Sequence, residues 1–65
     1  MKEERLLKLA EVMEVTSLGR ASIYQQVKRG TFPKPVKIGR RSVAWPATEI
    51  QVWIRDCIAA RNAGA

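Results

Sequence analysis

The sequence contains no histidine and a single cysteine, Cys57. It therefore lacks the residue most often used for general acid–base catalysis near neutral pH. It also has no cluster spaced for binding a metal ion and no glycine-rich loop for binding phosphate. A lone cysteine cannot form an intramolecular disulfide, which fits a reducing compartment. We expect a protein that is not an enzyme, with no cofactor, no metal and no small-molecule substrate.

Long apolar runs are also absent. No segment approaches the roughly 20 apolar residues that a membrane-spanning helix needs, and residues 1–5 are charged, unlike a signal peptide. We expect a cytoplasmic protein with no membrane partner. The 65 residues are enough for one small core, so residues 1–65 are expected to form a single domain.

Acidic residues are missing from the middle of the chain. Residues 15–48 contain none, while seven cations fall there: Arg20, Lys28, Arg29, Lys34, Lys37, Arg40 and Arg41. The remainder of the chain carries a formal charge of −1, and the whole chain carries +6. Charges segregated in this way favour a binding face for a polyanion over an ordinary mixed surface.

Two short helices are predicted in the first half. Residues 9–15 place Leu9, Val12 and Met13 on one face at helical spacing. Residues 17–19 then form a turn, in which Leu18 is expected to pack between the helices. Neither Leu7 nor Lys8 is a good N-cap for the first helix.

The second helix is predicted over residues 20–29. Gly19 can act as its N-cap, and Gly30 stands where a left-handed C-cap belongs. Ile23 and Val27 point inward, with Tyr24 at their edge. The opposite face is polar and free of acid: Ala21, Ser22, Gln25 and Arg29.

Two prolines, at 33 and 35, exclude a regular element just after the second helix. The residues that follow, 36–45, are predicted to form a short hairpin. Its tip is Gly39–Arg41, and its apolar positions are Val36, Ile38, Val43 and Trp45.

A third helix should begin at Pro46 and bury an apolar stripe: Ile50, Trp53, Ile54, Cys57 and Ile58. The first residues and residues 62–65 are expected to be loose ends.

The predicted fold class is mainly α with a small β-hairpin, arranged as a winged helix-turn-helix.

A helix-turn-helix places its second helix in the major groove of DNA. Ala21 and Ser22 are small enough to sit near its start, Gln25 can pair with adenine, and Arg29 with guanine. Arg20 is better placed for a phosphate. The candidate residues of this helix are Arg20, Ala21, Ser22, Gln25, Gln26, Lys28 and Arg29.

The hairpin is the predicted wing, whose tip contacts phosphates or enters a narrow minor groove. Its candidate residues, with the flank, are Lys34, Lys37, Arg40, Arg41 and Ser42. Lys28, Lys34 and Lys37 add attraction that is independent of sequence. Each predicted DNA contact has a simpler alternative. Gln25 and Arg29 could be an ordinary solvated helix face, and Arg40 and Arg41 a charged turn. Lys34 and Lys37 could protect an edge strand from aggregation.

Three aromatic residues, Tyr24, Trp45 and Trp53, could stack on single-stranded nucleic acid, but each fits a core position better. Cys57 is likewise expected in the core. Glu49 and Asp56 lie too far apart for a catalytic pair, and Glu49 complements the start of the third helix.

Three strings of this chain resemble the AlpA family of prophage regulators: Leu18-Gly-Arg-Ala-Ser-Ile-Tyr24, Gly30-Thr-Phe-Pro-Lys-Pro-Val-Lys-Ile-Gly39 and Val43-Ala-Trp45. That family is similar to phage excisionases and to the DNA-binding domains of MerR-type regulators. The resemblance implies a bacterial, nucleoid-associated protein that promotes excision or activates genes of an integrated element. Two positions depart from the family pattern: Gly19 replaces a usual Ser or Thr, and Ser17 stands where Gly is common.

The leading hypothesis is sequence-specific binding of duplex DNA. Integrase, RNA polymerase or further copies of the chain on DNA are possible partners. One alternative is a protein-interaction module, an antirepressor or integrase adaptor, with only non-specific affinity for DNA. Another is an RNA-binding protein, which would usually need exposed aromatic rings.

Overall fold

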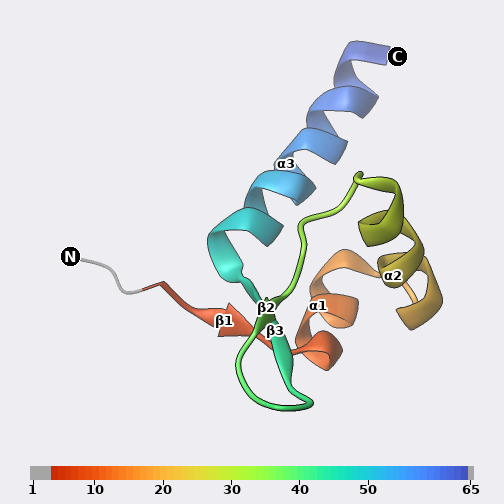
Figure 1. The fold of residues 1–65 in the computed structure, drawn as a ribbon. Helices are drawn as coiled ribbons and strands as arrows, with labels where there is room; N and C mark the ends of the chain where they lie inside the picture. Colours follow the sequence, from red (N-terminus) through yellow and green to blue (C-terminus); the bar gives the residue numbers. More distant parts are fainter. Residues whose placement is uncertain (1–3, 65) are drawn as a thin grey trace.

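The elements follow one another as helix, turn, helix, hairpin and helix, preceded by a short strand (Figure 1). The structure is a computed structural model that describes residues 4–64. Its elements are β1 (Leu6–Leu7), α1 (Leu9–Thr16), α2 (Arg20–Arg29), β2 (Val36–Lys37), β3 (Val43–Pro46) and α3 (Ala47–Gly64). The predicted fold class, mainly α with a small β-hairpin in a winged helix-turn-helix, is confirmed.

The sheet has three antiparallel strands in the order β1-β3-β2. β3 is central: Leu7 lies opposite Trp45, and Val36 lies opposite Ala44. The hairpin was predicted, whereas β1 was not, because two residues show no periodicity. The loose start was also a wrong expectation for Arg5, whose carbonyl accepts a hydrogen bond of 2.7 Å from the Ala47 N–H. Residues 1–3 lie outside the described residues.

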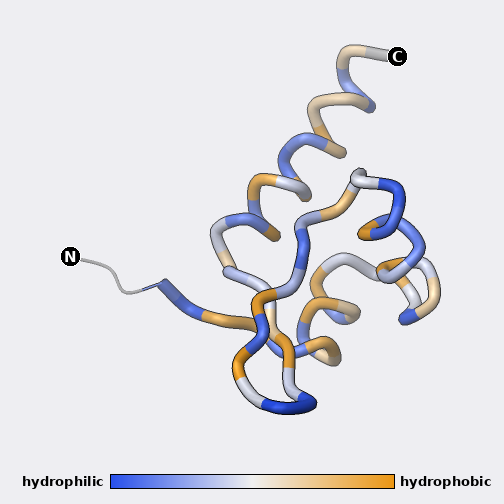
Figure 2. Tube along the Cα trace, viewed as in Figure 1, coloured by the Kyte–Doolittle hydropathy of each residue, from blue (hydrophilic) through white to orange (hydrophobic). Residues whose placement is uncertain are grey.

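The core gathers side chains from nearly every element. Its buried members are Leu7, Val12, Ile23, Phe32, Trp45 and Ile50. Trp45 is completely buried, and its ring meets Phe32 edge-on with 6.5 Å between centroids. Figure 2 shows that hydrophobic positions recur along α1, the hairpin and α3, with hydrophilic positions between them.

The helix-turn-helix corner follows the predicted local signals. Ser17 adopts a left-handed conformation with φ of 62°, and Leu18 packs against the core. α2 has the predicted bounds, with Gly19 as N-cap and Gly30 as left-handed C-cap at φ of 82°. Lys8 gives α1 no side-chain cap, as expected, but its N–H donates to Glu11 Oε1 at 2.9 Å.

α3 begins one residue later than predicted. Pro46 is the last residue of β3, opposite Leu6, and the helix starts at Ala47. The carboxylate of Glu4 accepts hydrogen bonds from the N–H of Thr48 at 3.3 Å and from its hydroxyl at 2.8 Å. This carboxylate thus satisfies donors in the first turn of α3.

The second half of α3 projects from the body (Figure 1). Ile50 is buried and Ile54 partly buried, but Ile58 is 48% exposed and Cys57 is exposed. The core assignment of Cys57 was therefore wrong, because the apolar spacing continues past the end of the body. The loose tail was also a wrong expectation for residues 62–64, which are helical. Ala65 lies outside the described residues.

The apolar positions of the hairpin differ in burial. Trp45 is buried and Val43 is partly buried, whereas Val36 and Ile38 are exposed. β2 is an edge strand whose main contacts are with β3, so alternation there does not lead to burial. Among residues 4–64, no helix has the length and apolarity needed to cross a bilayer.

Candidate nucleic-acid interface

The outer face of α2 is open to solvent. Ala21, Ser22, Gln25 and Arg29 are all exposed, as the helical spacing predicted, and Ile23 beneath them is completely buried. The first turn of α2 has no acidic residue, and its N-cap is Gly19, which has no side chain that could accept a hydrogen bond from the first N–H groups. The start of α2 therefore offers unobstructed backbone donors and no negative charge.

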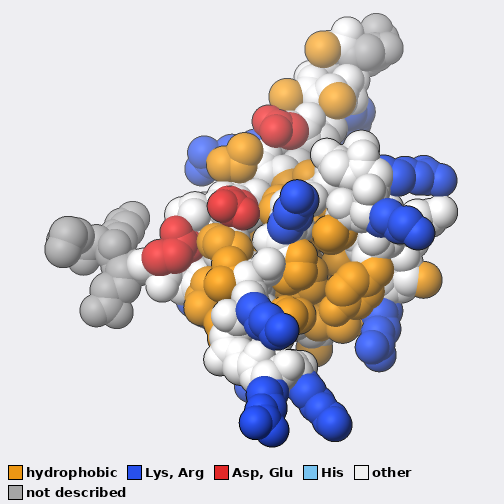
Figure 3. Space-filling view, viewed as in Figure 1, with side chains coloured by type: hydrophobic (Ala, Val, Ile, Leu, Met, Phe, Trp, Pro, Cys, Tyr) orange, Lys and Arg blue, Asp and Glu red, His pale blue; other side chains and the backbone are white. Residues whose placement is uncertain are grey.

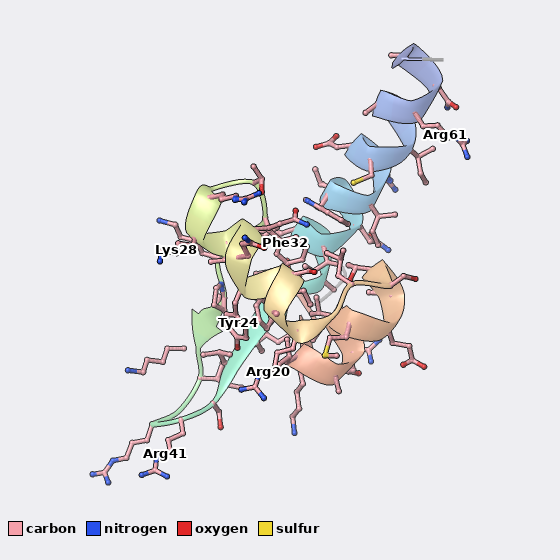
Figure 4. The ribbon with its side chains drawn as sticks, turned by 90° about the vertical axis from the view of Figure 1, so that its right-hand side faces the viewer. Arg20, Tyr24, Lys28, Phe32, Arg41 and Arg61 are labelled. Carbon is pink, nitrogen blue, oxygen red and sulfur yellow. The ribbon has the colours of Figure 1, made fainter. Side chains whose placement is uncertain are left out.

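A second exposed row runs along the edge of α2 next to the hairpin. Arg20, Tyr24 and Lys28 are spaced one turn apart, and all three are exposed. Figure 4 shows this row, with Arg20 at the end nearer the hairpin tip. Two cations thus flank one phenol on a single side of the helix.

The hairpin carries its charge at the tip. The N–H of Ile38 donates to the carbonyl of Ser42 at 2.9 Å, which closes the loop. Arg40, Arg41 and Ser42 in this loop are exposed, and Arg41 extends away from the body in Figure 4. The hairpin therefore carries its two arginines at an exposed tip.

A groove of about 420 Å³ separates the start of α2 from the hairpin. We call it the wing groove; its lining is Lys8, Leu9, Arg20, Tyr24, Ile38, Arg41, Ser42 and Val43. Three cations and a tyrosine surround an apolar floor. Charged donors in this arrangement suit a phosphate, and the apolar floor suits the attached sugar.

Lys8 and Tyr24 are members of the wing groove that the sequence did not indicate. Tyr24 was assigned to the core, but it is 39% exposed. Its ring packs at the edge of Trp45, with 6.2 Å between centroids. The flanking Arg20 and Lys28, four residues before and after it, were the signal that could have revealed Tyr24. Lys8 had no comparable signal.

Other predicted contact residues lie outside the wing groove. Gln26 is half-buried at the end of α2, where its carbonyl accepts a hydrogen bond of 3.3 Å from the Thr31 hydroxyl. Lys34 and Lys37 are exposed, in the segment after α2 and on β2. Neither lysine lines the wing groove.

Two tryptophans fix the segment between α2 and the hairpin. The indole N–H of Trp45 donates to the Pro33 carbonyl at 2.8 Å, and that of Trp53 to the Thr31 carbonyl at 3.0 Å. Trp45 is in the core as predicted, and the half-buried Trp53 meets Phe32 edge-on at 4.9 Å. Both rings thus hold the wing in place relative to α2.

Positive side chains predominate over the hairpin and α2, whereas α3 carries both signs (Figure 3). Figure 3 shows Lys and Arg side chains over the hairpin and α2, while the visible acidic side chains lie along α3 and near the N-terminal strand. No three His, Cys, Asp or Glu side chains within residues 4–64 are grouped to hold a metal ion. The chemistry available on the α2 and hairpin side is therefore that of cationic and amide donors.

Comparison with known proteins identifies the family. The family model described as "Prophage CP4-57 regulatory protein (AlpA)" matches residues 5–58. The chain belongs to the AlpA family. The match includes α2, the hairpin and most of α3, and it confirms the resemblance inferred from the three strings. This is a family of regulatory proteins and not a family of enzymes.

Two relatives support the assignment. The uncharacterized protein ORF88 of Enterobacteria phage P4 is 39% identical over 62 residues, which cover 95% of this chain and 70% of that protein. The DNA-binding transcriptional activator AlpA of Escherichia coli K12 is 36% identical over 56 residues, covering 77% of this chain and 80% of that protein.

Proposed function

We propose that this AlpA-family protein binds duplex DNA in a sequence-specific way and regulates a prophage or another integrated element. α2 enters the major groove and the hairpin acts as the wing. The observation that carries this proposal is the wing groove, where cations from α2 and the hairpin converge beside the acid-free face of α2. The relative in Escherichia coli, named a DNA-binding transcriptional activator, supports the same function.

The outer face of α2 reads the bases. Gln25 makes paired hydrogen bonds with adenine and Arg29 with guanine, which are the usual partners of these side chains. Both are exposed. Ala21 and Ser22 near the start of α2 are small and let the helix approach the base edges.

The wing groove and the tip hold the backbone. Arg20, Arg41 and Lys8 surround one phosphate, and the Tyr24 hydroxyl donates a further hydrogen bond. Arg40 and Ser42 contact the adjacent backbone. Outside the wing groove, three lysines add non-specific attraction to the phosphates: Lys28, Lys34 and Lys37. Gln26 holds the end of α2.

In the cell, the protein acts in the bacterial cytoplasm, on the nucleoid, as a non-enzymatic single-domain regulator. Excision requires several copies side by side on bent DNA, whereas activation requires one site beside a promoter, with integrase or RNA polymerase as the respective partner. The uncovered end of α3 gives the rival proposal, a protein-interaction module, its specific support. In that rival, Arg29→Ala leaves activity intact, whereas changes around Arg55 and Arg61 abolish it.

The test is capture of sheared genomic DNA from the source strain by the purified protein at near-physiological salt, followed by sequencing. Enrichment at an attachment site or a mobile-element promoter supports the proposal. Tandem sites favour excision, and a lone promoter site favours transcriptional control. If no fragment is enriched over bulk DNA, specific duplex recognition is wrong and the protein-interaction rival takes its place. Competition between duplex DNA and RNA distinguishes the RNA-binding alternative.

A further inference from the structure

A second groove, of about 350 Å³, lies along the first half of α3. We call it the acidic groove; its lining is Pro33, Thr48, Glu49, Val52, Trp53 and Asp56. Glu49, Val52, Trp53 and Asp56 follow the helical spacing i, i+3, i+4, i+7, so they form one face of α3. Two carboxylates therefore border an apolar floor, in which Val52 is 53% exposed.

Neither carboxylate takes part in an ion pair within the described part of the chain. Within residues 4–64, the only ion pair joins Arg5 to Glu11, at 3.0 Å. Glu49 and Asp56 thus border the groove without an ion-pair partner among these residues, on a chain whose formal charge is +6. The acidic groove is complementary to a segment that combines a cation with apolar side chains.

The chain itself displays such a segment at the far end of α3. Ile54, Ile58 and Arg61 follow the spacing i, i+4, i+7 on one face, and Cys57 lies one turn before Arg61. Ile58 is 48% exposed, and the Arg61 guanidinium donates two hydrogen bonds to the side-chain oxygen of the adjacent Asn62, at 3.2 and 3.3 Å. In Figure 4, Arg61 lies near the end of α3, far from the hairpin tip that carries Arg41.

This projecting helix end lacks packing of its own. The core contacts of α3 end at Ile54, yet the helix continues to Gly64. In proteins, most of the stability of a helix comes from tertiary packing of its apolar face. A surface that covers Ile58 would stabilise the end of α3.

We propose that the acidic groove of one copy binds the projecting end of α3 from a second copy of this chain. Arg61 of the second copy lies between Glu49 and Asp56, and its Ile58 covers Val52 and Trp53. The two surfaces differ, so the contact is head-to-tail and can repeat from copy to copy instead of closing into a symmetric pair. It leaves α2 and the wing free, and it does not depend on DNA binding.

Disulfide crosslinking tests the arrangement. Val52→Cys adds a thiol in the acidic groove, and the native Cys57 lies on the projecting end. Five positions apart on a straight helix, the two thiols are too distant to pair within one chain. Mild oxidation should therefore give a ladder of covalent dimers, trimers and larger species. The unmodified chain, with one thiol, can give only dimers.

Matched variants decide the outcome. Ala10→Cys places the second thiol on the exposed side of α1 and should give no ladder above random collision. In the Val52→Cys chain, Glu49→Arg with Asp56→Arg should suppress the ladder, and adding Arg61→Glu should restore it; circular dichroism confirms that each variant is folded. A missing ladder, an equal ladder from Ala10→Cys, or a ladder insensitive to charge reversal would overturn the proposal. These readouts need no DNA, so they are independent of the genomic capture experiment.

Discussion

Trp45 donates its indole N–H to the carbonyl of Pro33 at 2.8 Å, which ties the centre of the core to the segment joining α2 and the hairpin. Trp53 makes the same kind of bond to Thr31, at 3.0 Å. Two indole hydrogen bonds, to Pro33 and to Thr31, thereby hold the segment that separates α2 from the hairpin. In a domain of this size, such side-chain bonds replace the larger core that would otherwise fix a loop.

Replacing Trp45 by Phe should therefore lower the free energy of unfolding by about 2–4 kcal/mol. Losing the donor leaves the Pro33 carbonyl unsatisfied, and the smaller ring leaves a cavity. Trp53→Phe is the matched control. Because its hydrogen bond is exposed, the cost should be only about 0.5–1.5 kcal/mol. Urea unfolding measures both variants, and equal costs would contradict the assigned role of Trp45.

Substituting the two glycines that bound α2 should change the stability of the protein in opposite directions. Gly30 has φ of 82°, so Gly30→Ala should destabilise the protein by about 1–2 kcal/mol. Gly19 has φ of −78°, and a Cβ there would meet nothing within 4 Å. Gly19→Ser should therefore stabilise the protein by a few tenths of a kcal/mol by adding a cap. Thermal unfolding of the two variants checks the signs; loss of stability in Gly19→Ser would show that no capping bond forms.

The elements predicted correctly are those with local signals. α2 has the predicted bounds because Gly30 adopts the left-handed C-cap conformation that its position indicated, and Gly19 serves as the N-cap. β1 was missed because its two residues become a strand only by pairing with β3. The core role of Cys57 failed for the converse reason: its helical spacing is regular, but no partner element extends far enough to cover it.

The residues of the candidate site were likewise predicted only where a local pattern indicates them. Helical periodicity alone places Gln25 and Arg29 on the exposed face of α2. The wing groove, in contrast, brings Lys8 from before α1 next to Arg41 of the hairpin, 33 positions later in the sequence. No local pattern connects such residues, since only the packing of α1 and α2 against β3 makes them neighbours.

The Tyr24 hydroxyl should contribute to DNA binding without being needed for folding. Tyr24→Phe keeps the ring that packs on Trp45 but removes a donor from the wing groove. We expect a loss of about 0.5–1.5 kcal/mol in binding free energy and little change in unfolding free energy. The salt dependence of binding should stay the same, because no charge is removed. Titration of a short duplex at several salt concentrations measures affinity and slope together, and an unaltered affinity would exclude a hydroxyl contact.

The wing is tested by its contribution to counterion release. Removing both tip charges with Arg40→Ala and Arg41→Ala should weaken binding to a short duplex and reduce the slope of log K against log salt by about one to two units, at roughly 0.9 per phosphate contact. Arg55→Ala with Arg61→Ala removes the same charge from α3 and is the matched control. It should leave the slope nearly unchanged, because both residues lie on α3 and neither lines the wing groove. If the tip variant retained the full slope, the hairpin would make no phosphate contact, and α2 with the remaining groove cations would have to account for binding alone. Equal decreases in both variants would instead indicate attraction by net charge, without a defined wing.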